Sequence, residues 1–328
     1  MLETLLPSLA HGLAARVSGR RLSVLIFHRV LPDPDPLFPH EMHAARFDRL
    51  VAFLKGRWNV VPLGQAYRQL RAGTLPSGSV AITFDDGYSD NASVALPILR
   101  ARGAAATFFV ATGFLDGGRM WNDTVIESIR RARGSALDLY DLELGHYTLA
   151  GVESRRTAID TLLGKLKYRA MEERKRLVSL IAERVGAALP DSLMMTSEQL
   201  RRLRDSGMEV GAHTVNHPIL SRLPAEEARH EITASKAQLE AILGQQVSLF
   251  AYPNGKPGQD YLPEHAQFVR EAGFDIAVST AWGACDRNTD PYQLPRFTPW
   301  HEQHTAFALA LARNLLRRGV LQKAEAWA

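Results

Sequence analysis

The segment AITFDDGY, residues 81–88, decides the fold prediction because it joins a buried strand to a polar turn. The apolar run that ends at Phe84 predicts a strand with no solvent face, which is typical of parallel sheets. Asp85 and Asp86 follow at once, and Gly87 permits a sharp turn. Side chains at this end of a barrel strand lie where active sites form. A solvated Asp-Asp-Gly turn is the alternative interpretation, and the apolar strand before it weakens that alternative.

Similar short apolar runs recur along the chain and alternate with longer stretches of helical periodicity. This order predicts an α/β protein built as a barrel or as an open parallel sheet. The number of runs favours a barrel over a sandwich. The candidate strands are residues 22–27, 59–63, 80–84, 105–110, 208–212, 247–252, 275–278 and 293–295.

Two helices are predicted from the residues at their ends. Thr196, with Gln199 three residues later, forms a capping box, and Gly207 closes the helix that follows. A second helix begins at Pro224 and stops at Gly244. Each helix precedes a candidate strand, as a repeating βα order requires.

One region interrupts this order. The connection over residues 114–196 is far longer than usual, and it contains helical stretches at residues 122–133 and 154–185. We interpret it as a helical subdomain inserted into a barrel that spans residues 22–300. An N-terminal helix over residues 1–21 and a C-terminal helix over residues 301–328 complete the predicted organisation.

The composition is that of an ordinary soluble protein, with 46% hydrophobic and 23% charged residues and a net charge of +4. Its basic residues are scattered, which argues against a nucleic-acid partner. Cys285 is the single cysteine, so no intrachain disulfide forms, and a small buried side chain is the expected role. No clear signal peptide or transmembrane run is present, which favours the cytoplasm. The terminal helices are candidates for docking on a membrane surface or a protein, or for packing on the domain.

A second polar motif, HTVNH at residues 213–217, also follows a candidate strand. A spacing of four places two imidazoles on one side of a turn, where both reach one ion. A lone histidine is more often structural, but His213 and His217 combine with the carboxylates after another strand. Two histidines and Asp86 leave a coordination position open, as in catalytic metal sites. They favour Zn²⁺, although other divalent first-row ions suit the same ligands.

The TFDDG and HTVNH segments together resemble the two most specific signatures of the polysaccharide deacetylases, which include chitin, chitooligosaccharide and peptidoglycan deacetylases. The resemblance covers roughly residues 22–297 without the insertion. It implies a distorted (β/α)7 TIM-like barrel that hydrolyses N-acetyl groups of sugars with a divalent metal ion. By position, it implies Asp85 as the general base and Asp86, His213 and His217 as the metal ligands.

The third segment, FAYPNG at residues 250–255, departs from the family pattern. Many members carry an arginine at the position of Ala251, and that arginine orients the catalytic carboxylate. Its absence resembles the branch that includes exopolysaccharide poly-N-acetylglucosamine deacetylases. We expect Arg296 to replace it beside Asp85, with a surface salt bridge as the alternative. The turn at Tyr252 and Asn254 is expected to present a backbone N–H to an oxyanion.

The general acid is expected to be His28, which ends the strand at residues 22–27. This position resembles the Tyr-His element of the exopolysaccharide branch, and the alternative is a rim histidine that only packs. His301 and His304 lie in the region of the family's late histidine motif but in a different context.

The substrate is expected to be an N-acetylated oligo- or polysaccharide. Trp121 opens the insertion and is expected either to stack on a sugar ring or to anchor the subdomain. Two other functions remain open at this point: a carbohydrate-binding pseudoenzyme, and a hydrolase of another amide, such as a cyclic imide or a peptidoglycan fragment.

Overall fold

A computed structural model describes residues 20–298, 301 and 303–316. The N-terminal helix expected over residues 1–21 and the last residues of the C-terminal helix expected over 301–328 lie outside these residues. Within the described residues, no helix is long and apolar enough to cross a membrane.

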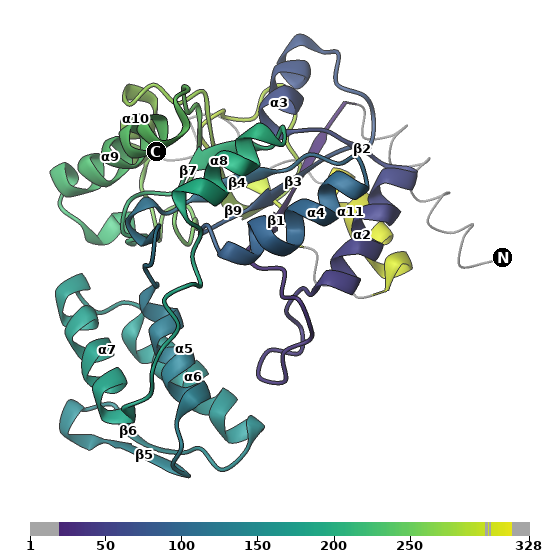
Figure 1. Ribbon diagram of the computed structural model, residues 1–328. Helices are drawn as coiled ribbons and strands as arrows, with labels where there is room; N and C mark the ends of the chain where they lie inside the picture. The colour runs from purple at the N-terminus through teal and green to yellow at the C-terminus, as the bar shows by residue number, and fades with distance from the viewer. Residues whose placement is uncertain (1–19, 299–300, 302, 317–328) are drawn as a thin grey trace.

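The centre of the protein is an eight-stranded sheet in the order β1-β3-β4-β7-β8-β9-β10, with β2 also paired to β3 (Figure 1). All of these pairings are parallel. Phe297, just after β10, exchanges backbone hydrogen bonds with Val24 and Ile26 of β1, which closes the sheet into a distorted barrel. The strands are β1 (Leu22–Phe27), β2 (Asn59–Val60), β3 (Ser79–Phe84), β4 (Thr107–Val110), β7 (Glu209–Ala212), β8 (Leu249–Ala251), β9 (Ile276–Trp282) and β10 (Leu294–Arg296).

Every candidate strand of the sequence analysis overlaps a strand of the sheet, and most differences are of one or two residues at an end. Two strands differ more. β9 continues four residues past the predicted end, to Trp282, and β2 ends at Val60 because Pro62 is the N-cap of a helix that begins at Leu63. Pro at the start of a helix is favourable, since its missing N–H has no helical partner there.

Helices surround the sheet. The predicted capping box is present: Thr196 accepts a hydrogen bond from the Gln199 N–H, and the Gln199 side chain accepts one from the Thr196 N–H. The predicted stop at Gly244 is also present, in the left-handed conformation. The helices of the barrel are α2 (Ala44–Arg57), α3 (Leu63–Ala72), α4 (Leu96–Ala101), α8 (Ser197–Asp205), α9 (Ala225–Leu243), α10 (Pro263–Glu271) and α11 (His304–Leu316).

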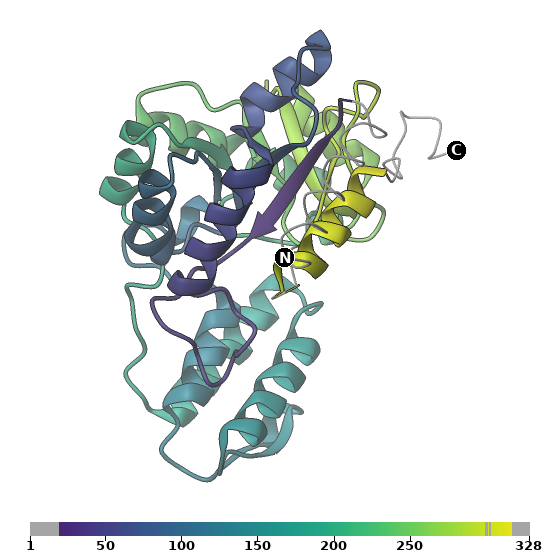
Figure 2. The same ribbon diagram turned by 90° about the vertical axis from the view of Figure 1, so that its right-hand side faces the viewer.

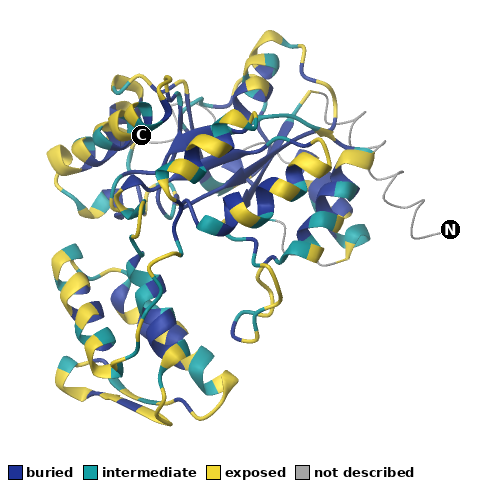
Figure 3. Cartoon of the chain, viewed as in Figure 1, coloured by how far each residue is buried: buried dark blue, intermediate teal, exposed yellow. Residues whose placement is uncertain are grey.

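Apart from β2 and the end of β9, the strands of the sheet are buried on both faces, as Figure 3 shows. One face packs on the helices through side chains such as Phe84, Phe108 and Phe250. The other face belongs to a second cluster, which includes Ala81 and Phe109 and is shared with α3. This double burial is why the strands read as continuous apolar runs in the sequence.

The insertion forms a separate lobe beside the barrel (Figures 1 and 2). It has its own apolar core, to which Ile129, Ile159 and Ile181 contribute. The expected long helical stretch at residues 154–185 is two helices, and a β-hairpin stands where no strand was expected. The elements of this lobe are α5 (Trp121–Arg131), β5 (Ala136–Leu139), β6 (Gly145–Thr148), α6 (Val152–Leu166) and α7 (Met171–Val185).

Candidate metal centre and active site

The candidate residues meet at the carboxyl ends of the strands. Asp85 and Asp86 follow β3, His213 follows β7, Asn254 follows β8 and His28 follows β1. All of them line one cavity of about 310 Å³, together with His217. A barrel collects the side chains from the ends of its strands on this face.

Asp86, His213 and His217 form the cluster that is suited to a cation. Their ligand atoms all lie within 4.8 Å of one another. Asp86 Oδ1 is 3.4 Å from His213 Nε2 and 3.3 Å from His217 Nε2. Ligand atoms about 2.0–2.2 Å from a tetrahedral ion lie about 3.3–3.6 Å apart, so these separations suit one shared cation.

Two further observations support a cation at this cluster. Asp86 Oδ1 is buried without a hydrogen-bond partner, and a buried carboxylate oxygen is rarely left in that state. Burial lowers the pKa of His217 to about 4, so its imidazole is neutral and able to donate a lone pair. The residues present therefore fit a divalent ion with two nitrogen ligands and one oxygen ligand.

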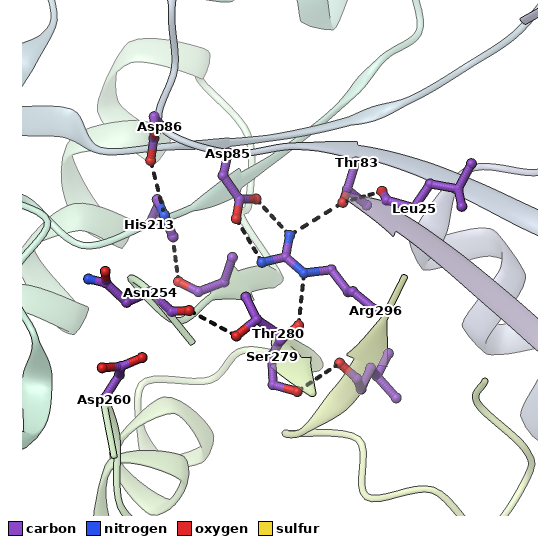
Figure 4. Close-up of polar contacts among 12 residues, drawn as sticks. Leu25, Thr83, Asp85, Asp86, His213, Asn254, Asp260, Ser279, Thr280 and Arg296 are labelled. Carbon is purple, nitrogen blue, oxygen red and sulfur yellow. Dashed lines mark hydrogen bonds and ion pairs between the residues drawn. The ribbon is translucent and has the colours of Figure 1, made fainter. Parts of the chain in front are cut away.

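A backbone carbonyl fixes the orientation of the His213 ring. Its Nδ1 lies 2.7 Å from the carbonyl oxygen of Ala251 on β8 (Figure 4). A carbonyl only accepts a hydrogen bond, so Nδ1 carries the proton and Nε2 faces Asp86. Histidine ligands of metal ions are commonly held in this way.

The backbone is unusual around these side chains. Asp86, Thr214, His217 and Asn254 all have positive φ, at 77°, 65°, 51° and 58°. This conformation is uncommon outside glycine and especially unfavourable for a β-branched residue such as Thr214. Strain of this kind persists where the surrounding structure holds it, typically at functional sites.

Gly87 allows the turn that carries Asp85 and Asp86 to pack closely against β4. Its φ is 91°, and a Cβ atom there would lie 2.9 Å from Cγ1 of Val110 on β4. A larger residue would therefore push the Asp85-Asp86 turn away from its neighbouring strand.

Glu231 of α9 holds the HTVNH loop, and the sequence analysis did not identify it. Its carboxylate accepts hydrogen bonds from the N–H groups of Val215 and Asn216 and from the Asn216 side chain, at 2.7–2.8 Å. Glu231 is 6% exposed. It is separated from the motif by a helix start, so no local spacing pointed to it.

We predict that Glu231→Gln weakens metal binding, because its amide group would meet the Asn216 amide donor-to-donor and shift the loop that carries His217. Loss of such an outer partner typically lowers metal affinity about 10–100-fold. Calorimetric titration with Zn²⁺ measures the change. The exposed Glu227 on the same helix provides the control variant Glu227→Gln, and equal affinities for the two variants would contradict the role of Glu231.

Arg296 of β10 lies against Asp85. Its two terminal nitrogens donate to the two carboxylate oxygens at 2.7 Å each, and Nε donates to the carbonyl of Ser279 at 2.9 Å (Figure 4). Arg296 is 1% exposed and Asp85 is 3% exposed, so this is a buried bidentate ion pair and not a surface salt bridge.

The charge state of Asp85 follows from these neighbours. Burial acts to raise the pKa of Asp85, but the positive charge of Arg296 and its hydrogen bonds to the carboxylate outweigh it, and the pKa is lowered. The carboxyl group is therefore ionised at neutral pH and able to accept a proton. Arg296 occupies the place that the sequence analysis assigned to it beside Asp85.

Two other residues of the sequence analysis reach the site region. His28 is exposed at the rim and lines the same cavity as the metal ligands. Asn254 lines this cavity and the one next to it. His304, by contrast, stacks on Phe53 with ring centroids 4.7 Å apart, away from the residues that line the cavity.

Tyr252 was expected near the substrate, and the structure does not place its side chain there. The residue is fully buried, its ring stacks on Tyr261 at 3.8 Å, and its hydroxyl donates to the Tyr292 carbonyl. Its backbone N–H donates to the Val278 carbonyl. Because both polar groups are used inside the protein, Tyr252 is a core residue.

Asp123 is a further buried acid near the site. It lies in the first turn of α5, is 3% exposed, and accepts a hydrogen bond from the Tyr88 hydroxyl at 3.2 Å. Burial raises the pKa of Asp123 to about 7; the charge of Arg29 opposes this rise and that of Asp86 adds to it.

We predict that Asp123 makes the metal-free protein less stable as the pH rises from 5 to 8. The folded protein keeps a proton on Asp123 until the pH approaches its pKa of about 7, whereas the unfolded chain has already lost that proton at pH 5, so the free energy of unfolding falls up to about pH 7. The loss is about 2–3 kcal/mol. Denaturant unfolding of chelator-treated protein at both pH values should show a smaller loss for Asp123→Asn. Asp160→Asn, at an exposed position, is the control, and an identical pH dependence in all three proteins would contradict the prediction.

Comparison with known proteins agrees with this geometry. The model of the polysaccharide deacetylase family matches residues 72–135 and 156–277, which is more than half of the chain. The chain therefore belongs to the polysaccharide deacetylase family.

Two curated proteins match over shorter segments. The candidate polysaccharide deacetylase YxkH of Bacillus subtilis (strain 168) is 26% identical over 112 residues, which are 34% of this chain and 39% of YxkH. A protein of Arthroderma benhamiae named as a peptidoglycan-N-acetylglucosamine deacetylase is 32% identical over 108 residues, which are 33% of this chain and 24% of that protein. The matches thus span well under two thirds of the length of these relatives.

Solved structures share the fold along most of the chain. The deacetylase PplD of Streptococcus pyogenes has a TM-score of 0.56 at 20% identity, covering 85% of this chain and 92% of PplD. IcaB from Ammonifex degensii has a TM-score of 0.57 at 21% identity, covering 88% and 97%. The deacetylase domain of BpsB from Bordetella bronchiseptica has a TM-score of 0.55 at 18% identity, covering 85% and 96%.

Proposed function

We propose that the protein is a metal-dependent hydrolase that removes N-acetyl groups from an N-acetylated oligo- or polysaccharide and releases acetate. The observation that carries this proposal is the convergence of Asp86, His213 and His217 around a buried, unpartnered carboxylate oxygen, next to a second carboxylate held by Arg296. Membership of the polysaccharide deacetylase family supports the reaction class.

Asp86, His213 and His217 would hold the ion, and Zn²⁺ suits this ligand set best. When bound, such an ion lowers the pKa of water and polarises a carbonyl group. The rest of the reaction depends on the protein's own side chains.

Asp85 is proposed as the general base that takes a proton from the attacking water. Its lowered pKa keeps it ionised, and the bidentate contact with Arg296 fixes the direction of its oxygens. His28, at the rim of the same cavity, is proposed to donate a proton to the amine that leaves. The backbone at Asn254 is proposed to stabilise the oxyanion.

We place the substrate among exopolysaccharides of the poly-N-acetylglucosamine type. Ala251 stands where many family members carry the arginine that pairs with the catalytic carboxylate, and Arg296 pairs with Asp85 instead. Two alternatives are a carbohydrate-binding pseudoenzyme and a hydrolase of another amide. The presence of both Asp85 and Asp86 favours activity, since binding alone needs neither the base nor its buried arginine.

A panel of substrates tests the proposed function. The metal-loaded protein is incubated with N-acetylglucosamine oligomers, peptidoglycan fragments and a cyclic imide, and the acids released are quantified. Release of acetate from the N-acetylglucosamine oligomers is the expected result. Binding of these oligomers without release of acetate would establish the pseudoenzyme instead.

A further inference from the structure

A second cavity adjoins the metal centre, between the barrel and the inserted lobe. It measures about 270 Å³ and shares Asp86, His217 and Asn254 with the first cavity. The lobe contributes Lys167 and Arg174 to its lining. A ligand that reaches the metal centre can therefore extend toward two basic side chains.

Arg174 is the unusual residue of this cavity. It lies on α7 and is 6% exposed, and one terminal nitrogen donates to the carbonyl of Lys167 at 2.9 Å. Its guanidinium lies over the ring of Trp121, 4.8 Å from the centroid. Burial lowers the pKa of Arg174, and no acidic group acts in the opposite direction.

Arg174 lacks a counter-charge within the described part of the chain. The neighbouring Glu173 pairs with Arg169. Glu172 lines two further cavities that Arg174 also lines, but it forms no ion pair with Arg174. Lys167 is also unpaired with any described carboxylate, and its ammonium lies 5.5 Å from the ring of Tyr168.

An arginine keeps its charge under all ordinary conditions. Removing that charge from water without a partner is costly, and an anion that enters the cavity would offset the cost. A guanidinium also binds two oxygens of a carboxylate or phosphate at once, and such a group carries the negative charge that the hydroxyl groups of a neutral sugar lack.

Trp121 lines the same cavity and contacts both Arg174 and the lobe. The Arg174 guanidinium lies over its ring, and the side chain packs against the apolar core of the lobe. Trp121 holds the cation in place at the cavity wall.

We propose that this cavity is a subsite for an anionic group, a carboxylate or a phosphate, carried by the same glycan whose N-acetyl group reaches the metal centre. The proposal rests on the proposed function, because that function brings a glycan to the site. It goes further by adding an acidic group to that exopolysaccharide, so that the N-acetylhexosamine units are accompanied by a carboxylate or phosphate and the substrate is not a neutral homopolymer.

The test measures binding by calorimetry with the metal-loaded full chain. Three oligosaccharides of equal length serve as probes: a neutral N-acetylglucosamine oligomer, an oligomer that alternates N-acetylhexosamine with uronic acid, and an N-acetylhexosamine oligomer that carries a phosphate. The variant Arg174→Met keeps the length and packing of the side chain and removes the charge. Arg184→Met removes a charge from the same helix at an exposed ion pair with Asp141 and is the control.

The expected result is that the wild type binds one of the acidic oligomers about 10-fold more tightly than the neutral one, as one well-placed charged hydrogen-bonded contact provides. Arg174→Met should remove most of this preference and leave the affinity for the neutral oligomer unchanged, whereas Arg184→Met keeps the preference. The probe that shows the preference identifies the anion as carboxylate or phosphate.

Two results would overturn the proposal: equal wild-type affinity for all three probes, or an equal loss of affinity for all three in Arg174→Met, which would indicate a structural role. If Arg174→Met does not fold, Lys167→Gln is used for the same comparison, because Lys167 is only half-buried. Failure of the wild type to release acetate from any probe would count against the proposed function, and the binding preference still decides the subsite.

Discussion

Asp85→Asn is expected to lower the rate of acetate release by about 10²–10⁴-fold, the usual contribution of a general base. The amide has nearly the shape of the carboxylate but does not accept a proton. Asp86, His213 and His217 are unchanged, so the variant should bind one divalent ion per chain as the wild type does. Measuring acetate release and metal content on the same preparation separates the two effects.

A matched control is available for this variant. Asp48 also forms a two-bond ion pair with an arginine, Arg102, but at the protein surface. Asp48→Asn should therefore have wild-type activity. Near-normal turnover by Asp85→Asn would remove this residue from the mechanism, whereas loss of the metal together with activity would show that it acts on the metal site.

Arg296→Met is expected to have the largest effect on stability. It leaves the Asp85 carboxylate buried without its partner, and breaking a buried ion pair from one side costs about 3–5 kcal/mol of unfolding free energy. Two further hydrogen bonds, to the Ser279 carbonyl and the Thr83 hydroxyl, are lost as well. Acetate release should also fall, because Asp85 is no longer held in one direction.

Denaturant unfolding checks this expectation. The double variant Asp85→Asn/Arg296→Met should recover part of the lost stability, because no buried charge remains unpaired. Arg102→Met, which breaks the exposed pair with Asp48, should be close to the wild type. If Arg296→Met is no less stable than Arg102→Met, the buried ion pair does not contribute to the free energy of unfolding as predicted.

The sequence predicted the barrel well because its strands are buried on both faces. Double burial demands continuous apolar residues, and the glycine turn at Gly87 marks where one such run ends. The hairpin of the lobe was missed for the opposite reason. Only Leu137 and Leu139 face the core from β5, which is too short an alternation to recognise among helical segments.

The site residues that could be predicted from the sequence are those that directly follow a strand. Such residues share one edge of the sheet, so the sequence alone predicts that Asp85, Asp86 and His213 lie together. Glu231 was not predicted, because it lies within a helix and reaches the site only through tertiary packing. Tyr252 was expected near the substrate, but its hydroxyl and its backbone N–H both donate to carbonyls inside the protein, and such long-range partners are not visible in the sequence.

We propose that Asp86, His213 and His217 hold a divalent ion without which no acetate is released. This proposal is tested by a titration of chelator-treated protein with Zn²⁺ while acetate release from an N-acetylglucosamine oligomer is followed. We expect no release at the start, a rise that ends near one ion per chain, and no recovery in His217→Ala. Full activity of the metal-free protein would contradict it.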